Sequence, residues 1–278
     1  MTVYLFTLFI GIGSLLAGFL GSLTGLGGGV VIVPMLVLGF GVDIRYAVGA
    51  SLVSVIATSS AAASSFVREG YSNIRIGMFL EIATTLGAVL GAIIAAKMPS
   101  SAISIVFGTV LLHASYSSFR TRHIHEGGDR PDPLAQRLRL DGTYPGASGL
   151  MSYHVQRVPL GFALMFGAGS LSGLLGIGSG TVKVLAMDRV MRIPFKVSTT
   201  TSNFMIGVTA AASAGVYLNR GYLDPGLTMP VMLGVLIGAL FGSRLLIRSR
   251  SNTLRVVFSA VTLILAVEMI YHGLSGRL

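Results

Sequence analysis

The sequence contains no cysteine and few charged residues, and each shortage excludes a class of protein. Without cysteine, the chain has no disulfides, no thiolate metal sites, no iron–sulfur clusters and no thiol nucleophile. Charged residues make up 11% of the 278 positions, against about 25% in an average soluble domain. With 53% apolar residues and a mean hydropathy of +0.80, the composition predicts an all-α polytopic membrane protein whose main solvent is the lipid bilayer.

Acidic residues are scarcer than basic ones, which leaves a formal net charge of +10. In a soluble protein this excess would suggest a nucleic-acid partner, whereas in a membrane protein it reflects Lys and Arg in cytoplasmic loops. We therefore expect no nucleic acid. No basic residue precedes Arg45, so the basic start of a cleaved signal peptide is missing and we expect the first helix to be retained.

Apolar runs predict six full membrane spans, because about 20 apolar residues are enough to cross the hydrocarbon. Two other apolar regions, 3–23 and 159–175, run into glycine clusters that are followed by only a short apolar stretch. We expect these two regions to form the first arms of hairpins that enter the membrane and return. The six full spans are expected near residues 46–66, 76–97, 101–119, 197–218, 227–247 and 253–271.

The two halves of the chain match each other at a shift of 151 residues without a gap. The shift pairs Ser51 with Ser202, and it pairs three glycines of the first cluster with three of the second, Gly25, Gly27 and Gly29 with Gly176, Gly178 and Gly180. Such self-similarity indicates two copies of one structural unit. We expect a first transmembrane repeat over residues 1–119, a linker over 120–157 and a second repeat over 158–278.

The distribution of basic residues favours inverted copies. If residues 3–23 and 159–175 crossed the membrane, about ten basic residues would lie inside and nine outside. If both regions return to their own side, fifteen of the twenty lie inside and four outside, with Lys183 in the membrane. Because cytoplasmic loops are rich in Lys and Arg, we predict two inverted repeats, each with a glycine-broken re-entrant hairpin and about three transmembrane helices. Both termini are then outside, with a full crossing by residues 3–23 as the alternative.

The linker is the only polar stretch of any length. Alternating apolar and polar residues at 137–140 and 153–157 flank a turn rich in Gly and Pro, which predicts a small cytoplasmic β-hairpin. The linker is too short for an enzyme-sized domain, and the sequence shows no clustered intramembrane carboxylates, so we expect no enzyme activity. His123 and His125 form the only close histidine pair, and we expect no metal site and no cofactor.

The glycine clusters are the first candidate binding site. In an inverted repeat, two half-helix N-termini face each other near the membrane midplane, where unpaired backbone N–H groups attract an anion. The alternative is that the glycines only allow helices to cross closely. The candidate residues are Gly27, Gly28, Gly29, Gly178, Ser179 and Gly180.

Polar side chains near the clusters extend this candidate site. Lys183 follows the second cluster at a depth where a cation costs roughly 2.5–3.5 kcal/mol, so we expect either a bound anion or a carboxylate such as Glu81 to compensate it. Hydroxyl and amide groups bind oxyanions reversibly, although helix capping and interhelical hydrogen bonds are the alternative role. A carboxylate inside a span also suggests proton coupling, which Glu81 would carry. The hydroxyl and amide candidates are Ser51, Thr201, Ser202 and Asn203.

These residues resemble a known family over nearly the whole chain. The resemblance rests on both glycine clusters, on Lys183-Val184, and on the segments 50–52, 56–59, 73–77 and 201–209. In order and spacing they are similar to the sulfite exporter TauE/SafE family of membrane permeases. One departure is Leu185, where a proline is expected by analogy with Val33-Pro34.

The resemblance implies a secondary transporter in the cell membrane that exports small sulfur-containing anions such as sulfite or organosulfonates. A passive anion channel is the first alternative. A cation or metal permease is a second, although it would need carboxylates or His where this chain has glycines and Lys183. The exact anion, the direction, the coupling ion and the oligomeric state stay open.

Overall fold

The computed structural model describes residues 3–22, 28–68, 72–119, 132–146, 149–246 and 251–276. Nearly all of these residues are helical, and the two halves have the same order of elements. Each half has one long helix, then a short α-helix that continues as a π-helical turn, then three long helices. The first half comprises α1 (Val3–Ser22), α2 (Gly29–Pro34), η1 (Met35–Gly39), α3 (Ile44–Arg68), α4 (Ile74–Lys97) and α5 (Ser100–Phe119). The second half comprises α7 (Val158–Leu175), α8 (Gly180–Leu185), η2 (Ala186–Val190), α9 (Phe195–Asn219), α10 (Pro225–Leu246) and α11 (Ser251–Ser275).

Four of the described helices are long and apolar enough to cross a membrane, namely α1, α4, α7 and α10. Shorter apolar helices cover residues 29–39, 44–60, 100–116 and 259–275. The chain is therefore a polytopic membrane protein. Of the helices that we expected to span, α4 and α10 are among the four long apolar ones. Helix α9 is in neither the long nor the short apolar set, because its first half carries the polar run 198–203. Both α1 and α7, which we expected to be hairpin arms, are long enough to cross.

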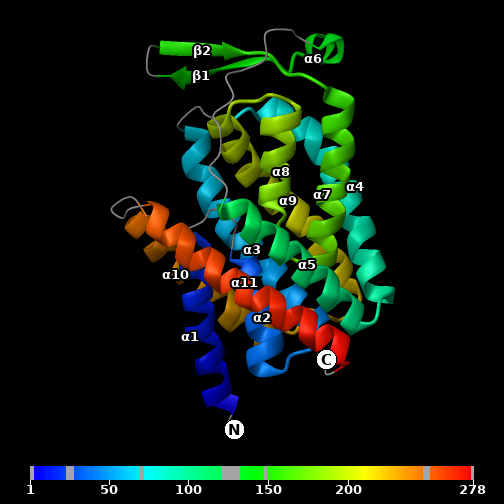
Figure 1. Ribbon diagram of the computed structural model, residues 1–278, viewed down its shortest axis with the longest axis vertical. Coiled ribbons are helices and arrows are strands. Elements are labelled where there is room, and N and C mark those ends of the chain that lie inside the picture. The colour runs from blue at the N-terminus through cyan, green and yellow to red at the C-terminus, as the bar shows by residue number, and fades with distance from the viewer. Residues whose placement is uncertain are drawn as a thin grey trace.

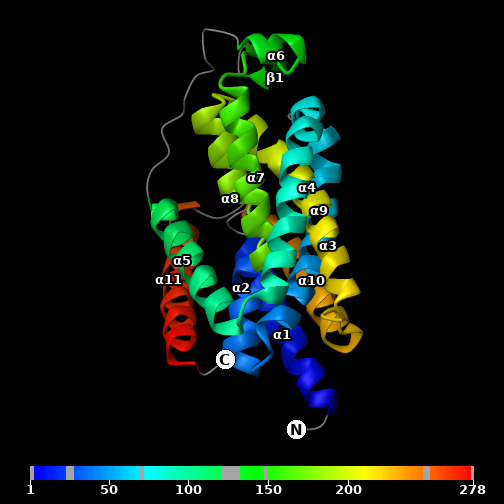
Figure 2. The same cartoon turned by 90° about the vertical axis from the view of Figure 1, so that its right-hand side faces the viewer.

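Helices of the two halves pack against each other in equivalent pairs. Helix α1 packs against α10 as α7 packs against α4, while α3 packs against α9 and α5 packs against α11. The α5–α11 pair stands beside the other helices (Figure 2). The glycine contacts repeat as well: a Cβ at Gly18 would meet the backbone of Val235, and a Cβ at Gly169 would meet the backbone of Thr84. The shift of 151 residues relates Gly18 to Gly169, and it relates Thr84 to Val235.

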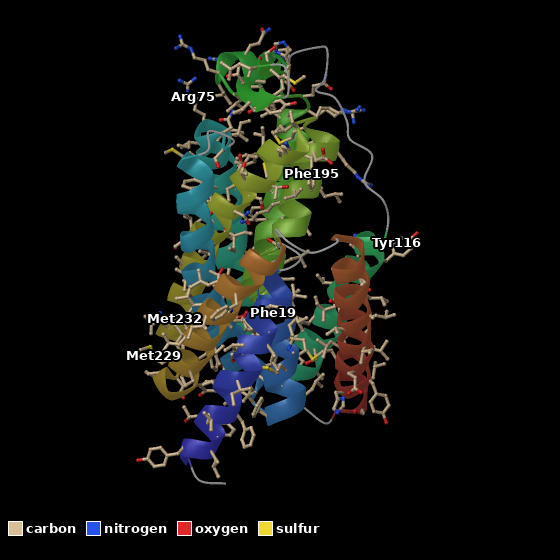
Figure 3. The ribbon with its side chains drawn as sticks, turned by 90° about the vertical axis from the view of Figure 1, so that its left-hand side faces the viewer. Phe19, Arg75, Tyr116, Phe195, Met229 and Met232 are labelled. Atoms are coloured by element: carbon tan, nitrogen blue, oxygen red, sulfur yellow. The ribbon has the colours of Figure 1, made fainter. Side chains whose placement is uncertain are left out.

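The long first helices of the two halves enter the structure from opposite ends. Helix α1 runs from the end that carries both termini to the middle, and α7 runs from the opposite end to the middle (Figures 1 and 2). We call these ends the terminal end and the hairpin end. At the terminal end, Arg45 Nη2 donates a hydrogen bond to the carbonyl of Met98 at 2.7 Å. At the hairpin end, where Arg75 also lies (Figure 3), the backbone N–H of Gln156 donates to the carbonyl of Met191 at 3.0 Å.

The hairpin end carries a small folded cap made by the linker. Strand β1 (Gly142–Gly146) pairs antiparallel with β2 (Gly149–Tyr153). The first alternating pattern, residues 137–140, does not form a strand, because a short helix α6 (Pro133–Arg137) ends there. Asp132 caps this helix by accepting a hydrogen bond from the backbone N–H of Leu134 at 2.8 Å. Asn73 Nδ2 donates to the Tyr153 hydroxyl at 2.7 Å, which ties the cap to the start of α4.

Candidate functional site

The two glycine clusters meet in the interior of the protein. The Ser51 hydroxyl, which is fully buried, donates a hydrogen bond to the carbonyl of Gly176 at 2.8 Å. A Cβ added at Gly29 would lie 2.7 Å from that carbonyl oxygen and 2.7 Å from Ser51 Oγ. The end of the first cluster therefore touches the beginning of the second, and a side chain at Gly29 would separate them. Gly28 is buried next to this contact, and Gly27 lies outside the described residues.

The second cluster turns through a left-handed backbone that brings a serine hydroxyl into the interior. Gly176 and Gly178 have φ values of 69° and 70°, and Ser179 has a φ of 43°. A residue with a Cβ rarely adopts this conformation, which costs roughly 1–2 kcal/mol. Ser179 is 2% exposed, and its hydroxyl has no hydrogen-bond partner among the described residues. A strained, buried and unpartnered hydroxyl is typical of a group that serves a ligand.

The polar run at the start of α9 contributes unequally. The Ser202 hydroxyl donates to the carbonyl of Gly180 at 3.3 Å, so Ser202 packs against the second cluster as Ser51 does. The Thr201 hydroxyl instead accepts a hydrogen bond from the backbone N–H of Asn73 at 3.1 Å, next to the cap. Asn203 is partly exposed, and its amide makes no hydrogen bond within the described part of the chain. Of the three candidates in α9, Ser202 is therefore the one that contacts a glycine cluster.

Lys183 lies one helical turn beyond the second cluster and is fully buried. Its Nζ donates a hydrogen bond to the Thr209 hydroxyl at 2.6 Å. The Thr209 oxygen lies 2.7 Å from Glu81 Oε1, to which it donates. Thr209 thus bridges an amine from α8 and a carboxylate from α4, and among the described residues no direct ion pair joins Lys183 to a carboxylate. We call Lys183, Thr209 and Glu81 the charge bridge.

The carboxylate of Glu81 is satisfied on one side only. Oε1 accepts a second hydrogen bond, from the Thr85 hydroxyl at 3.1 Å. Oε2 is buried and has no hydrogen-bond partner among the described residues. The neighbouring helix α7 contains no ionisable side chain, so Lys183 is the charge that balances Glu81. A buried carboxylate oxygen without a donor is a place where a proton or a ligand donor would be stabilised.

The described residues contain no group of three His, Cys, Asp or Glu side chains that could hold a metal ion. His123 and His125, the close pair in the sequence, lie outside the described residues. What the described residues bring together is one buried amine, one buried carboxylate, a serine hydroxyl without a partner among them and two segments of buried glycine backbone. Buried charges of this kind inside a helical membrane protein mark candidate solute pathways.

A polytopic helical membrane protein with charged groups buried between its halves has an architecture that membrane transporters use. The sequence profile described as sulfite exporter TauE/SafE matches residues 10–269. The chain therefore belongs to the sulfite exporter TauE/SafE family, which confirms the resemblance of the sequence motifs. It is a membrane transporter and not an enzyme.

Curated relatives match along almost their full length. The chain is 26% identical over 267 residues to the probable membrane transporter protein YunE of Bacillus subtilis, covering 94% of this chain and 96% of the relative. It is 26% identical over 231 residues to the probable membrane transporter protein YdhB of the same organism, covering 83% and 84%. A third relative, the probable membrane transporter protein MJ0441 of Methanocaldococcus jannaschii, is 24% identical over 269 residues, covering 92% of each chain. No solved structure matches the chain.

Proposed function

We propose that the protein is a secondary transporter that exports small sulfur-containing anions, such as sulfite or organosulfonates, across the cell membrane. The observation that carries the proposal is the fully buried Lys183 beside a glycine cluster. A buried cation is costly unless it is paired, and in membrane proteins such groups mark substrate pathways. The family name supports a sulfur oxyanion as the cargo.

The anion would bind where the two clusters meet. Gly27, Gly28, Gly29, Gly178 and Gly180 would expose backbone N–H groups, because they lack side chains that would keep a ligand away. Ser179 would donate its unpartnered hydroxyl, and Lys183 would supply the charge. Ser51 and Ser202 now donate to glycine carbonyls, so their part is to fix the backbone of the second cluster. Thr201 and Asn203 would act only after a movement of α9.

The repeated contacts support two inverted repeats, residues 1–119 and 158–278, joined by the linker 120–157. The first helices of the two halves run in opposite directions to the middle (Figure 1). The same glycine-to-backbone contact occurs in both copies. In such folds, one repeat rocks against the other about a central site, which gives access to each side in turn.

The charges at the two ends support an orientation. The terminal end has the basic residues Arg45, Lys97 and Arg220, whereas the hairpin end has more than twice as many among the described residues. Since cytoplasmic surfaces are rich in Lys and Arg, the cap would be cytoplasmic and both termini outside. The basic residues at the hairpin end are Arg75, Arg137, Arg139, Arg157, Arg189, Arg192 and Lys196.

The test is uptake into proteoliposomes of sulfite, thiosulfate, sulfoacetate, methanesulfonate, sulfate and chloride. We expect saturable uptake of at least one sulfur anion, and its loss in Lys183→Ala. Lys97→Ala is the matched control, because it removes the same side chain from an exposed helix end. Uptake that never saturates would favour the passive channel. If the wild type carries no anion above empty liposomes, the proposal is wrong.

A further inference from the structure

The charge bridge holds its two charges through a single hydroxyl. Thr209 has one proton and three acceptors within reach: its oxygen lies 2.7 Å from Glu81 Oε1, 2.9 Å from the carbonyl of Met205 and 3.4 Å from Thr84 Oγ1. The second acceptor is the residue four positions earlier in α9, a frequent partner of helical Thr hydroxyls. Thr209 can therefore turn its proton away from Glu81 and still donate a hydrogen bond. The bridge can open without leaving a buried donor unsatisfied.

The charge count at the bridge changes when an anion arrives. With the site empty, one amine and one carboxylate balance each other. An anion at Lys183 adds a second negative charge to a buried region that has one cation. Among the described residues, the helices packed around the bridge supply no other buried cation: α7 has no ionisable group, the basic residues of α4 lie near its ends, and α9 has Lys196 in its first turn. The turn η2, which follows α8, carries the exposed Arg189 and a second buried carboxylate, Asp188, so it adds no positive charge to the buried region. The Tyr217 hydroxyl of α9 donates its hydrogen bond to the carbonyl of Gly173 and not to the charge bridge.

A proton on Glu81 restores the balance, and the carboxylate has a place for it. Oε2 is buried and has no hydrogen-bond partner in the described part of the chain, whereas Oε1 already accepts from Thr209 and Thr85. A proton taken from water by Oε2 forms the neutral acid, after which Lys183 has the anion as its partner. On the other side of the membrane the anion leaves, the proton returns to water, and the carboxylate pairs with Lys183 again.

We propose that the charge bridge makes the transporter a proton–anion symporter that moves one proton with each anion in the same direction. Glu81 carries the proton, and Thr209 is the positioning residue that links the carboxylate to Lys183. The inference rests on the proposed function, since it requires that an anion binds at Lys183. It implies that the anion gradient and the pH gradient together set the direction of net transport, so that export proceeds only while the outward anion gradient exceeds any inward proton gradient.

The first experiment measures protons and anions together. Proteoliposomes containing a fluorescent pH dye, with the membrane potential clamped, receive labelled methanesulfonate, a monoanion that stays ionised at every pH used. We expect an acidic exterior to accelerate uptake several-fold, and the interior to acidify by one proton for each anion. Uptake without proton movement, or protons moving opposite to the anion, would overturn the symport while leaving the proposed function intact.

Variants of the bridge separate coupling from folding. In Glu81→Gln we expect anion exchange between equal concentrations to remain measurable and the acceleration by the pH gradient to disappear. Thr209→Val should reduce the proton-to-anion ratio below one, and Thr209→Ser should restore it. Thr85→Val is the matched control, because it also removes a hydrogen bond to Oε1 but does not touch Lys183. An unchanged ratio in Glu81→Gln contradicts the inference. If the wild type carries none of the anions, the proposed function and the symport both fail.

Discussion

Removing one charge of the bridge should destabilise the protein more than removing both. Hydrogen bonds of 2.6 and 2.7 Å through the Thr209 hydroxyl place Lys183 Nζ within about 5 Å of Glu81 Oε1. At an effective dielectric constant of about 20, unit charges at this separation attract by roughly 3 kcal/mol. Breaking a buried pair by deleting one partner costs about 3–5 kcal/mol, because the other charge stays behind unpaired.

We therefore expect Lys183→Met and Glu81→Gln each to lower the free energy of unfolding by about 3–5 kcal/mol. The double variant should lose no more than either single variant, because it leaves no unpaired charge. The interaction energy from the double-mutant cycle is then at least about 3 kcal/mol, at or above the upper end of the usual range for residues in one network. Lys97→Met is the control, since the Lys97 side chain is exposed.

The composition determines the assay. The chain has neither Trp nor Cys, so tryptophan fluorescence and thiol-reactive dyes report nothing. Helix content followed by circular dichroism during denaturation with sodium dodecyl sulfate in mixed micelles gives the four unfolding free energies. If the free energy of unfolding of the double variant falls by the sum of the two single losses, the charges do not interact and the reasoning is refuted.

The remaining predictions concern packing, orientation and the cap. Gly169→Ala should abolish folded protein in detergent size-exclusion profiles, because its Cβ would enter the backbone of α4, whereas Gly167→Ala has nothing within 4 Å and should be neutral. In the cysteine-free chain, Leu150→Cys in the hairpin should react with an impermeant maleimide only after cells are permeabilised, and Arg220→Cys should react in intact cells; the opposite pattern contradicts the orientation. Burial raises the pKa of Tyr153 to about 12, so the folded state keeps this proton longer than the unfolded chain, whose tyrosine titrates near pH 10. This difference in pKa contributes about 2–3 kcal/mol to the free energy of unfolding, which should be intact below about pH 10 and decline towards pH 12. The measurement is the difference in tyrosinate absorbance between the wild type and Tyr153→Phe as the pH is raised.

Hydropathy and glycine spacing predicted much of the fold. Helices occupy all six expected spans, since a run of apolar residues in lipid must satisfy its backbone internally and so becomes helical. The boundaries of the short helices followed less directly. The short helix α6 depends on Asp132 and Pro133, a local capping signal inside a stretch where alternation suggested a strand. A cap and a proline at the first turn outweighed the four-residue pattern that follows them.

The contacts of the candidate site were harder to predict than its members. The sequence identified Lys183 as a buried charge and offered Glu81 as one of two compensating groups, but nothing in it pointed to Thr209 between them. Residues 81 and 209 are separated by 128 positions, and periodicity within a helix gives no information about which face of α9 meets α4. For the same reason the sequence could not show which residue of the polar run 198–203 contacts a glycine cluster, and the structure places Ser202 there.

Thr209 has a counterpart in the first half of the chain. The shift of 151 residues pairs it with Thr58, and the structure shows the Thr58 hydroxyl donating to backbone carbonyls of its own helix, with that of Ser54 at 3.0 Å. In the first copy the residue that corresponds to Lys183 is Ile32, which is fully buried among apolar side chains. Both halves of the chain thus carry the threonine, and only in the half with an amine beside it does the hydroxyl join a charged network. The difference in charge between the two halves therefore lies at residues 32 and 183, while the threonine is the same in both.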